Sequence, residues 1–341
     1  MKNKYVNMKT NALIRALLVF ACVGILYACN KNNANNPGNS ATSPTDLSTQ
    51  SDDAAQVSNE SDAVNDDANT ALNSQVSIAG SSTASEQSGT TTVMGQEQPN
   101  GAGTDLSRLI CDATITVDTA SNPRTITITY DGTNCRGNRT RTGVVVISIP
   151  KGERWRDAGA WVSVAIENLK ITRISDGKTI VLNGTRTITN VSGGLLVDLA
   201  ILGTITHTVS GSLSITFDNG TRQWNVAKER VFTYNDGIVM TTTGTHTDSL
   251  GNTNVAEWGT TRFGVEFESL ISEPKVFRQD CDFRLVSGQN TILTDIGLTG
   301  VITYGLDAEG DPTGCPGSGT YYLKAVWTNA KGITITKILP Y

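Results

Sequence analysis

Carboxylates and an aromatic residue occur close together between residues 257 and 268. Glu257 precedes Trp258, and Glu266 and Glu268 are separated by one phenylalanine. Alternate residues of a strand share a face, so Glu266 and Glu268 lie on the same side. Paired carboxylates about 5–9 Å apart catalyse glycoside hydrolysis, and an aromatic ring gives a sugar a surface to stack on. Trp258, Glu257, Glu266 and Glu268 are therefore a candidate ligand surface, and the alternative is a solvated strand face.

Other reactive residue types are sparse. The two histidines, His207 and His246, stand between threonines, and we interpret both as polar strand positions open to solvent. Asp307, Glu309 and Asp311 alternate as the ligands of a calcium loop do, but no glutamate completes the pattern. They are a weak calcium candidate, for which an exposed acidic turn is the simpler explanation. We assign no catalytic residue and predict no cofactor and no other metal.

Four cysteines frame two similar units. Each unit has Cys-Asp, a strand, a second strand ending Ile-Thr-Tyr, a glycine-bearing loop with another cysteine, and a third strand. Four cysteines in an exported domain allow three disulfide pairings. The repeat selects Cys111–Cys135 and Cys281–Cys315, each within its own unit.

The first cysteine loop also carries three arginines, Arg136, Arg139 and Arg141. They could form a basic anion site. The corresponding loop of the second unit has three acids and no arginine, so the two loops share only the stapled turn. We interpret the arginines as solvated or paired within the domain.

From residue 106 the chain alternates apolar and polar residues, as in "RTITITYD" and "KTIVLNGTRTITN", with turn signals such as "SDGK" and "FDNGTR" between them. This period of two predicts about fourteen half-buried strands. Strands without intervening helices cannot form parallel crossovers. We therefore predict an all-β domain over 106–341, built on a large, mainly antiparallel sheet arranged as a sandwich, a barrel or a long meander.

The first 28 residues are typical of an export signal. Basic residues precede the short apolar run Ala16–Tyr27, which is too short to span a bilayer. The sequence Leu26-Tyr27-Ala28-Cys29 matches a bacterial lipobox, which predicts that Cys29 becomes the lipidated first residue of the mature chain. Asn30 favours the outer membrane, with the domain on either its periplasmic or its cell-surface side.

Residues 29–105 are rich in Asn, Ser, Thr and Asp, with one basic residue, Lys31, against ten acids. Such a segment buries too little apolar surface to offset its ordering entropy, so we expect a disordered tether. The domain after it has equal numbers of basic and acidic residues. That balance does not favour a nucleic-acid partner.

Four stretches carry a resemblance to a known family. They are Tyr130–Ile149, the strand Leu182–Asn190 with its Gly-Thr-Arg-Thr-x-Thr-Asn pattern, Glu257–Phe267 with its Trp-Gly pair, and Ile302–Cys315. Together they resemble uncharacterised outer-membrane lipoproteins of the Bacteroidota. The resemblance implies an envelope lipoprotein and supplies no catalytic residue.

The sequence leaves three functions open. We expect a non-enzymatic interaction or structural module of the cell envelope, anchored in the membrane by lipid, with a glycan or an envelope protein as its partner. One alternative is a carbohydrate-active hydrolase that uses the acids near Trp258. Another is a carrier of a hydrophobic ligand, which requires an apolar cavity. The oligomeric state stays open.

The lipobox gives a direct prediction. Cys29→Ala removes the thiol that would be acylated, so the protein should move from the membrane fraction to the soluble fraction, because each buried acyl CH₂ contributes about 0.8 kcal/mol to anchoring. Fractionation followed by immunoblotting measures the change. Continued membrane association of the variant would refute the lipid anchor.

Overall fold

The computed structural model describes residues 43–80, 110–315 and 319–341. Fourteen strands form one antiparallel sheet whose order follows the chain, except that β9 pairs with β7 and β10 beside the main path. Three short helical turns, η4 (Leu196–Asp198), α4 (Leu199–Leu202) and η5 (Gln279–Cys281), lie in the connections. The strands are β1 (Ala113–Asp118), β2 (Arg124–Thr133), β3 (Arg139–Ile149), β4 (Ala160–Arg173), β5 (Thr179–Asn190), β6 (Thr204–Phe217), β7 (Gly220–Tyr234), β8 (Ile238–Gly244), β9 (Val255–Thr260), β10 (Glu266–Arg278), β11 (Arg284–Thr294), β12 (Thr299–Leu306), β13 (Tyr322–Thr328) and β14 (Thr334–Pro340).

The predicted fold class is confirmed. Of the three arrangements left open, the chain adopts the long meander, in which each strand pairs with its neighbours in sequence through short turns. Alternation of buried and partly exposed residues along β5, β7 and β8 gives the sheet one packed face.

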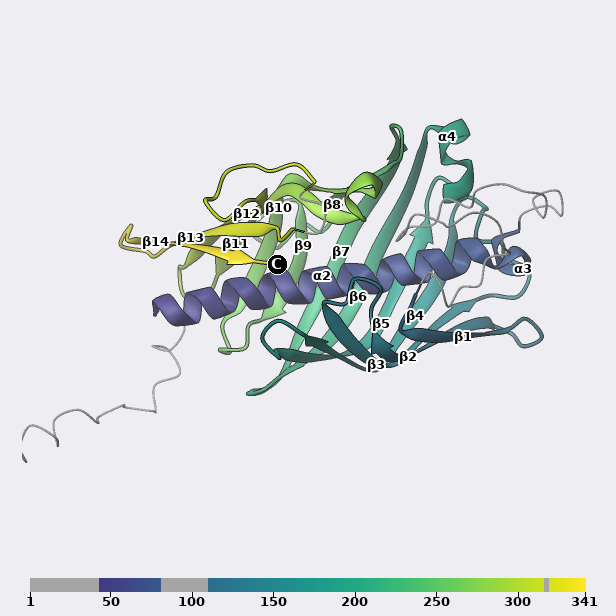
Figure 1. The fold of residues 1–341 in the computed structure, drawn as a ribbon, viewed down its shortest axis with the longest axis horizontal. Helices are drawn as coiled ribbons and strands as arrows, with labels where there is room; N and C mark the ends of the chain where they lie inside the picture. The colour runs from purple at the N-terminus through teal and green to yellow at the C-terminus, as the bar shows by residue number, and fades with distance from the viewer. Residues whose placement is uncertain (1–42, 81–109, 316–318) are drawn as a thin grey trace, which may run out of the picture. The chain divides into compact units, whose positions relative to one another are not determined.

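A long helix covers that packed face. Helix α2 (Pro44–Ser74) runs across the strands in Figure 1, and the short α3 (Val76–Ala79) follows it. The prediction of a disordered tether is therefore wrong over residues 44–79. Most of the side chains of α2 that are buried are polar or acidic, and partners on the sheet compensate for the apolar surface that the segment lacks. The predicted signal, Cys29 and residues 81–109 lie outside the described residues.

The start of α2 has a local cause. Ser43 is the N-cap, and its hydroxyl accepts a hydrogen bond from the backbone N–H of Asp46 at 3.1 Å. Pro44 occupies the first turn, where a missing N–H costs nothing. After the helix, the backbone N–H groups of Trp155 and Arg156 donate to the carbonyls of Ile78 and Ala79, which fixes α3 against the β3–β4 loop.

An apolar layer surrounds the polar contacts of α2. Trp155 is fully buried and packs edge-on against His207, which packs in the same way against Phe232. Burial, aided by Arg230, lowers the pKa of His207 to about 3, so the imidazole is neutral. The expectation of a solvent-exposed His207 is thus wrong, whereas His246 is half-buried. Within the described residues, no helix is long and apolar enough to cross a membrane.

Both predicted disulfides are present, Cys111–Cys135 and Cys281–Cys315. In each unit the first cysteine precedes the opening strand, β1 or β11, and the second lies in the loop before the third strand, β3 or β13. Tyr130 and Tyr304 occupy corresponding buried positions. The repeat inferred from the sequence is therefore also a repeat of strand order.

Gly305 gives a test of the backbone packing in the second unit. Its φ is +79°, and an added Cβ would lie 1.8 Å from the carbonyl oxygen of Val286. Gly305→Ala must displace a neighbouring strand, so the free energy of unfolding should fall by several kcal/mol, well beyond the about 1–2 kcal/mol of a left-handed alanine alone.

Gly332→Ala is the matched control, because Gly332 has a φ of +76° and no atom within 4 Å of the added Cβ. Urea denaturation of both variants measures the difference. Equal losses of free energy would show that the close approach of Val286 does not constrain the residue at position 305.

Candidate functional site

Acidic side chains of α2 meet basic side chains of the sheet along most of the helix. The concave network is our name for this set of ion pairs on the face of the sheet that packs against α2. Its members on the helix are Asp52, Asp53, Glu60, Asp62, Asp66 and Asp67, and their partners are Arg139, Arg141, Arg173, Lys178, Lys228, Arg230 and Arg262.

The centre of the network is fully buried. The Lys228 ammonium lies 3.0 Å from Asp62 and 2.7 Å from Glu257. Ser58 donates to Glu257 at 2.8 Å and accepts from Lys275 at 3.0 Å. Burial alone would raise the pKa of both carboxyls, but Lys228 and the other nearby cations outweigh it and hold both pKa values below their ordinary range. Both acids are therefore ionised.

Lys275 is the least compensated cation at this centre. It is 1% exposed, and burial together with Lys228 lowers its pKa to about 8. Lys228 differs because Asp62 and Glu257 overcome the effect of burial and raise its pKa. Asp62 and Glu257 thus stabilise the charge of Lys228 more than the charge of Lys275.

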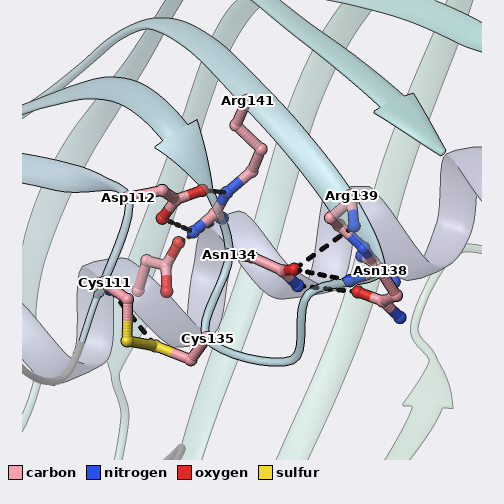
Figure 2. Close-up of a disulfide and its surroundings, with 8 residues drawn as sticks. Cys111, Asp112, Asn134, Cys135, Asn138, Arg139 and Arg141 are labelled. Atoms are coloured by element: carbon pink, nitrogen blue, oxygen red, sulfur yellow. Dashed lines mark hydrogen bonds and ion pairs between the residues drawn. A yellow bond between two sulfur atoms is a disulfide. The ribbon is translucent and has the colours of Figure 1, made fainter. Parts of the chain in front are cut away.

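One end of the network is built on the first cysteine loop. Figure 2 shows the Arg141 guanidinium beside Asp112. The two carboxylate oxygens of Asp112 accept hydrogen bonds from the Arg141 Nε and Nη2 groups at 2.6 and 2.7 Å. The same guanidinium donates to Asp67 of α2 at 2.6 Å and stacks over the Tyr130 ring. The Tyr130 hydroxyl donates to Asp67 at 2.8 Å. Arg141 thus joins the disulfide-stapled unit to the helix.

The neighbouring arginines behave differently. Arg139 pairs with Glu60 of α2 at 2.6 Å. Arg136 lies near Arg139 and Arg284, and burial followed by these two cations lowers its pKa to about 10. Two of the three loop arginines are therefore ion-paired with the helix, a role that the comparison of the two loops did not reveal.

The opposite end of the helix is held by the turns of the sheet. Asp52 accepts from Arg173 at 2.7 Å and also pairs with Lys178. Asp53 accepts from Arg262 at 2.7 Å. Because both ends and the centre are paired, the network fixes the position of α2 along the sheet.

A second site lies on the other face of the sheet. The Trp258 groove is our name for a surface depression of about 470 Å³ lined by Leu250, Asn252, Trp258, Gly259, Thr260, Glu266, Phe267, Glu268, Leu293, Thr294 and Asp295. Trp258 stacks on His246 with ring centroids 4.2 Å apart and an angle of 17°. Leu250, 86% exposed, stands at the tip of the loop beside it.

The loop that carries Leu250 is ordered by Asp248. Its carboxylate accepts from the backbone N–H groups of Leu250 at 2.9 Å and Asn252 at 2.7 Å, and from the Asn252 side chain at 2.6 Å. Slight burial and then the nearby Asp248 raise the pKa of Glu268. One carboxylate of this pair is thus easier to protonate than an isolated one.

The structure separates the predicted ligand residues. Trp258, Glu266 and Glu268 line the groove, but Glu257 is 3% exposed and pairs with Lys228 on the opposite face. Successive residues of a strand point to opposite faces, so Glu257 and Trp258 cannot share one surface.

The calcium candidate is a turn in the structure. The Asp307 carboxylate accepts from the backbone N–H groups of Glu309 at 3.1 Å and Asp311 at 2.9 Å. These bonds explain the spacing of the acids without an ion. Within the described part of the chain, the one cluster of ligand atoms spaced for a metal contains Asp280, Cys281 and Cys315, whose two sulfurs form a disulfide.

Sequence reasoning missed the acids of α2. A signal for the helix was present, because Ser43, Pro44 and Asp46 form an N-terminal capping pattern. The low hydrophobicity of the segment concealed it. Of the other tryptophans, Trp155, Trp224 and Trp327 are buried in the core, whereas Trp161 is 43% exposed.

No family model, no curated protein and no solved structure matches the chain.

The buried centre of the network gives a prediction. Asp62→Asn leaves Lys228 and Lys275 with one carboxylate, so the free energy of unfolding should fall by about 3–5 kcal/mol, as is typical when one partner of a buried ion pair is removed. Chemical denaturation measures this loss.

Asp280→Asn is the matched control, since Asp280 and its partner Arg278 are about half-exposed. The control should lose at most about 1 kcal/mol. A loss for Asp62→Asn no larger than that of the control would contradict a structural role for the concave network.

Proposed function

We propose that the chain is a non-enzymatic lipoprotein of the cell envelope that binds a glycan in the Trp258 groove. Lipidation at Cys29 anchors it to the outer membrane, as the lipobox and the resemblance to Bacteroidota lipoproteins suggest. The observation that carries the binding proposal is the Trp258 ring, which is half-buried, fixed by stacking on His246, and bordered by carboxylates and an amide.

The chemistry of the groove matches sugar recognition. An aromatic face and the apolar Leu250 contact the C–H surface of a pyranose, while Glu266, Glu268 and Asn252 offer partners for hydroxyl groups. Asp295 adds a further negative charge. The groove therefore favours neutral or amino sugars over acidic ones.

Two observations support binding over the alternative functions. Glu257 is buried and paired with Lys228 on the opposite face, so it is not available beside Trp258, which disfavours a hydrolase. Helix α2 occupies the concave face of the sheet with charged and polar side chains, which disfavours a carrier of a hydrophobic ligand.

The position of α2 also changes the geometry of anchoring. The link between Cys29 and the N-cap Ser43 consists of residues 30–42, which reach at most about 45 Å when extended. The proposed anchor thus keeps the domain within that distance of the lipid.

Trp258→Ala tests the proposal. Removing the indole should abolish binding to neutral or amino-sugar glycans on an array, or weaken it at least about tenfold, because each 1.4 kcal/mol of lost stacking is a factor of ten. Trp161→Ala is the matched control, since Trp161 is the more exposed tryptophan and lies on β4. Equal binding by the parent and both variants, or none by the parent, would contradict the proposal.

A further inference from the structure

The contact between α2 and the sheet is unusually polar for a buried interface. Side chains of α2 with at most 5% exposure include Gln50, Ser51, Asp53, Gln56, Ser58, Glu60, Ser61, Asp62, Asn65 and Asn69. Ion pairs of the acids and hydrogen bonds of Ser51, Ser58 and Asn65 provide part of the attachment. The side-chain amides of Gln50, Gln56 and Asn69 have no partner among the described residues. When α2 leaves the sheet, the surface that it exposes is mostly polar, with Leu47, Val57, Val64 and Leu72 as its larger apolar side chains.

The basic side of this interface is not fully neutralised. Arg186 is 1% exposed, and its guanidinium donates to the carbonyl of Ser61 and the amide oxygen of Asn65 but touches no carboxylate among the described residues. Its Nε and Nη2 have no partner within that part of the chain, nor do Nε and Nη1 of Arg230. Buried donors without acceptors cost free energy. The face of the sheet under α2 therefore offers more hydrogen-bond donors to anions than α2 occupies.

The covalent connection of α2 is long. Residues 81–109 separate Gly80 from Ile110, and a chain of that length reaches up to about 100 Å. This reach is long enough for α2 to pack against the same face of the sheet in a neighbouring molecule. The same contacts then form between two copies, so the exchange costs chiefly the entropy of association.

We propose that the concave face of the sheet is a binding groove for an acidic helix, and that α2 of a second copy of this chain is its ligand in trans. The acids of α2 provide the register, because Asp52, Asp62 and Asp67 meet bases from three different parts of the sheet. Exchange links two copies through their helices. This inference does not depend on the glycan proposal, which concerns the opposite face.

The test uses cross-linking between full chains that differ in one residue. Asp52 of α2 pairs with Lys178 at the accessible rim of the groove. One chain carries Asp52→Cys and the other Lys178→Cys, and the mixture is treated with a short bismaleimide after a transient exposure to urea, which loosens the packing of α2 on the sheet. The expected product is a covalent heterodimer whose linked peptides contain positions 52 and 178.

Two control experiments set the scale. A single chain with both substitutions gives the yield for the contact within one molecule. A mixture of Asp52→Cys with Asp295→Cys, which lies in the Trp258 groove, gives the yield of random collisions. The proposal requires a heterodimer yield at least about tenfold above the second control.

A yield equal to the collision control would overturn the proposal. So would displacement of α2 by dextran sulfate without any cross-linked pair, since the groove would then bind an anionic polysaccharide rather than an acidic helix. Competition by a synthetic peptide of residues 41–80, and not by the same peptide with Asp52, Asp62 and Asp67 changed to Asn, would confirm that the carboxylates determine the binding.

Discussion

The rest of the structure depends on the neutralisation of basic groups buried on one face of the sheet. Lys228, Arg230 and Lys275 are at most 1% exposed, and an uncompensated charge in such a position costs several kcal/mol. Asp62 and Asp66 of α2 pair with Lys228 and Arg230. An apolar helix of the same length would fill the space but would leave Arg230 without a carboxylate and Lys228 with Glu257 alone.

This constraint explains why the helix has a unique position. Hydrophobic contacts are non-directional and tolerate sliding, whereas an ion pair at 2.6–3.0 Å fixes two atoms relative to each other. Pairs at both ends and at the centre of α2 leave no other register with equal compensation. The buried charges thus contribute more to specificity than to net stability, as is known for some other buried polar groups.

The two faces of the sheet consequently differ in character. The face under α2 is committed to the ion pairs, and Glu257 belongs to it. The opposite face is open at Trp258, where an aromatic ring, an exposed leucine and several oxygen acceptors lie together. Trp258 and Glu257 are neighbours in sequence, yet the alternation of the strand assigns one to the groove and the other to the network. Neighbouring side chains of one strand therefore belong to two different surfaces.

Local pattern determined much of this protein in advance. Alternating residues specified the strands and their antiparallel pairing, and the repeated Cys-Asp and Ile-Thr-Tyr elements specified both disulfides, because these features depend on neighbours in sequence or within one unit. The role of α2 could not be derived in this way. Its low hydrophobicity indicates disorder when the segment is considered alone, and its burial depends on cations such as Lys228, which is 166 residues distant from Asp62. Only the tertiary structure brings those charges together, and so only it decides that an acidic segment is a buried helix and that Arg139 and Arg141 hold it.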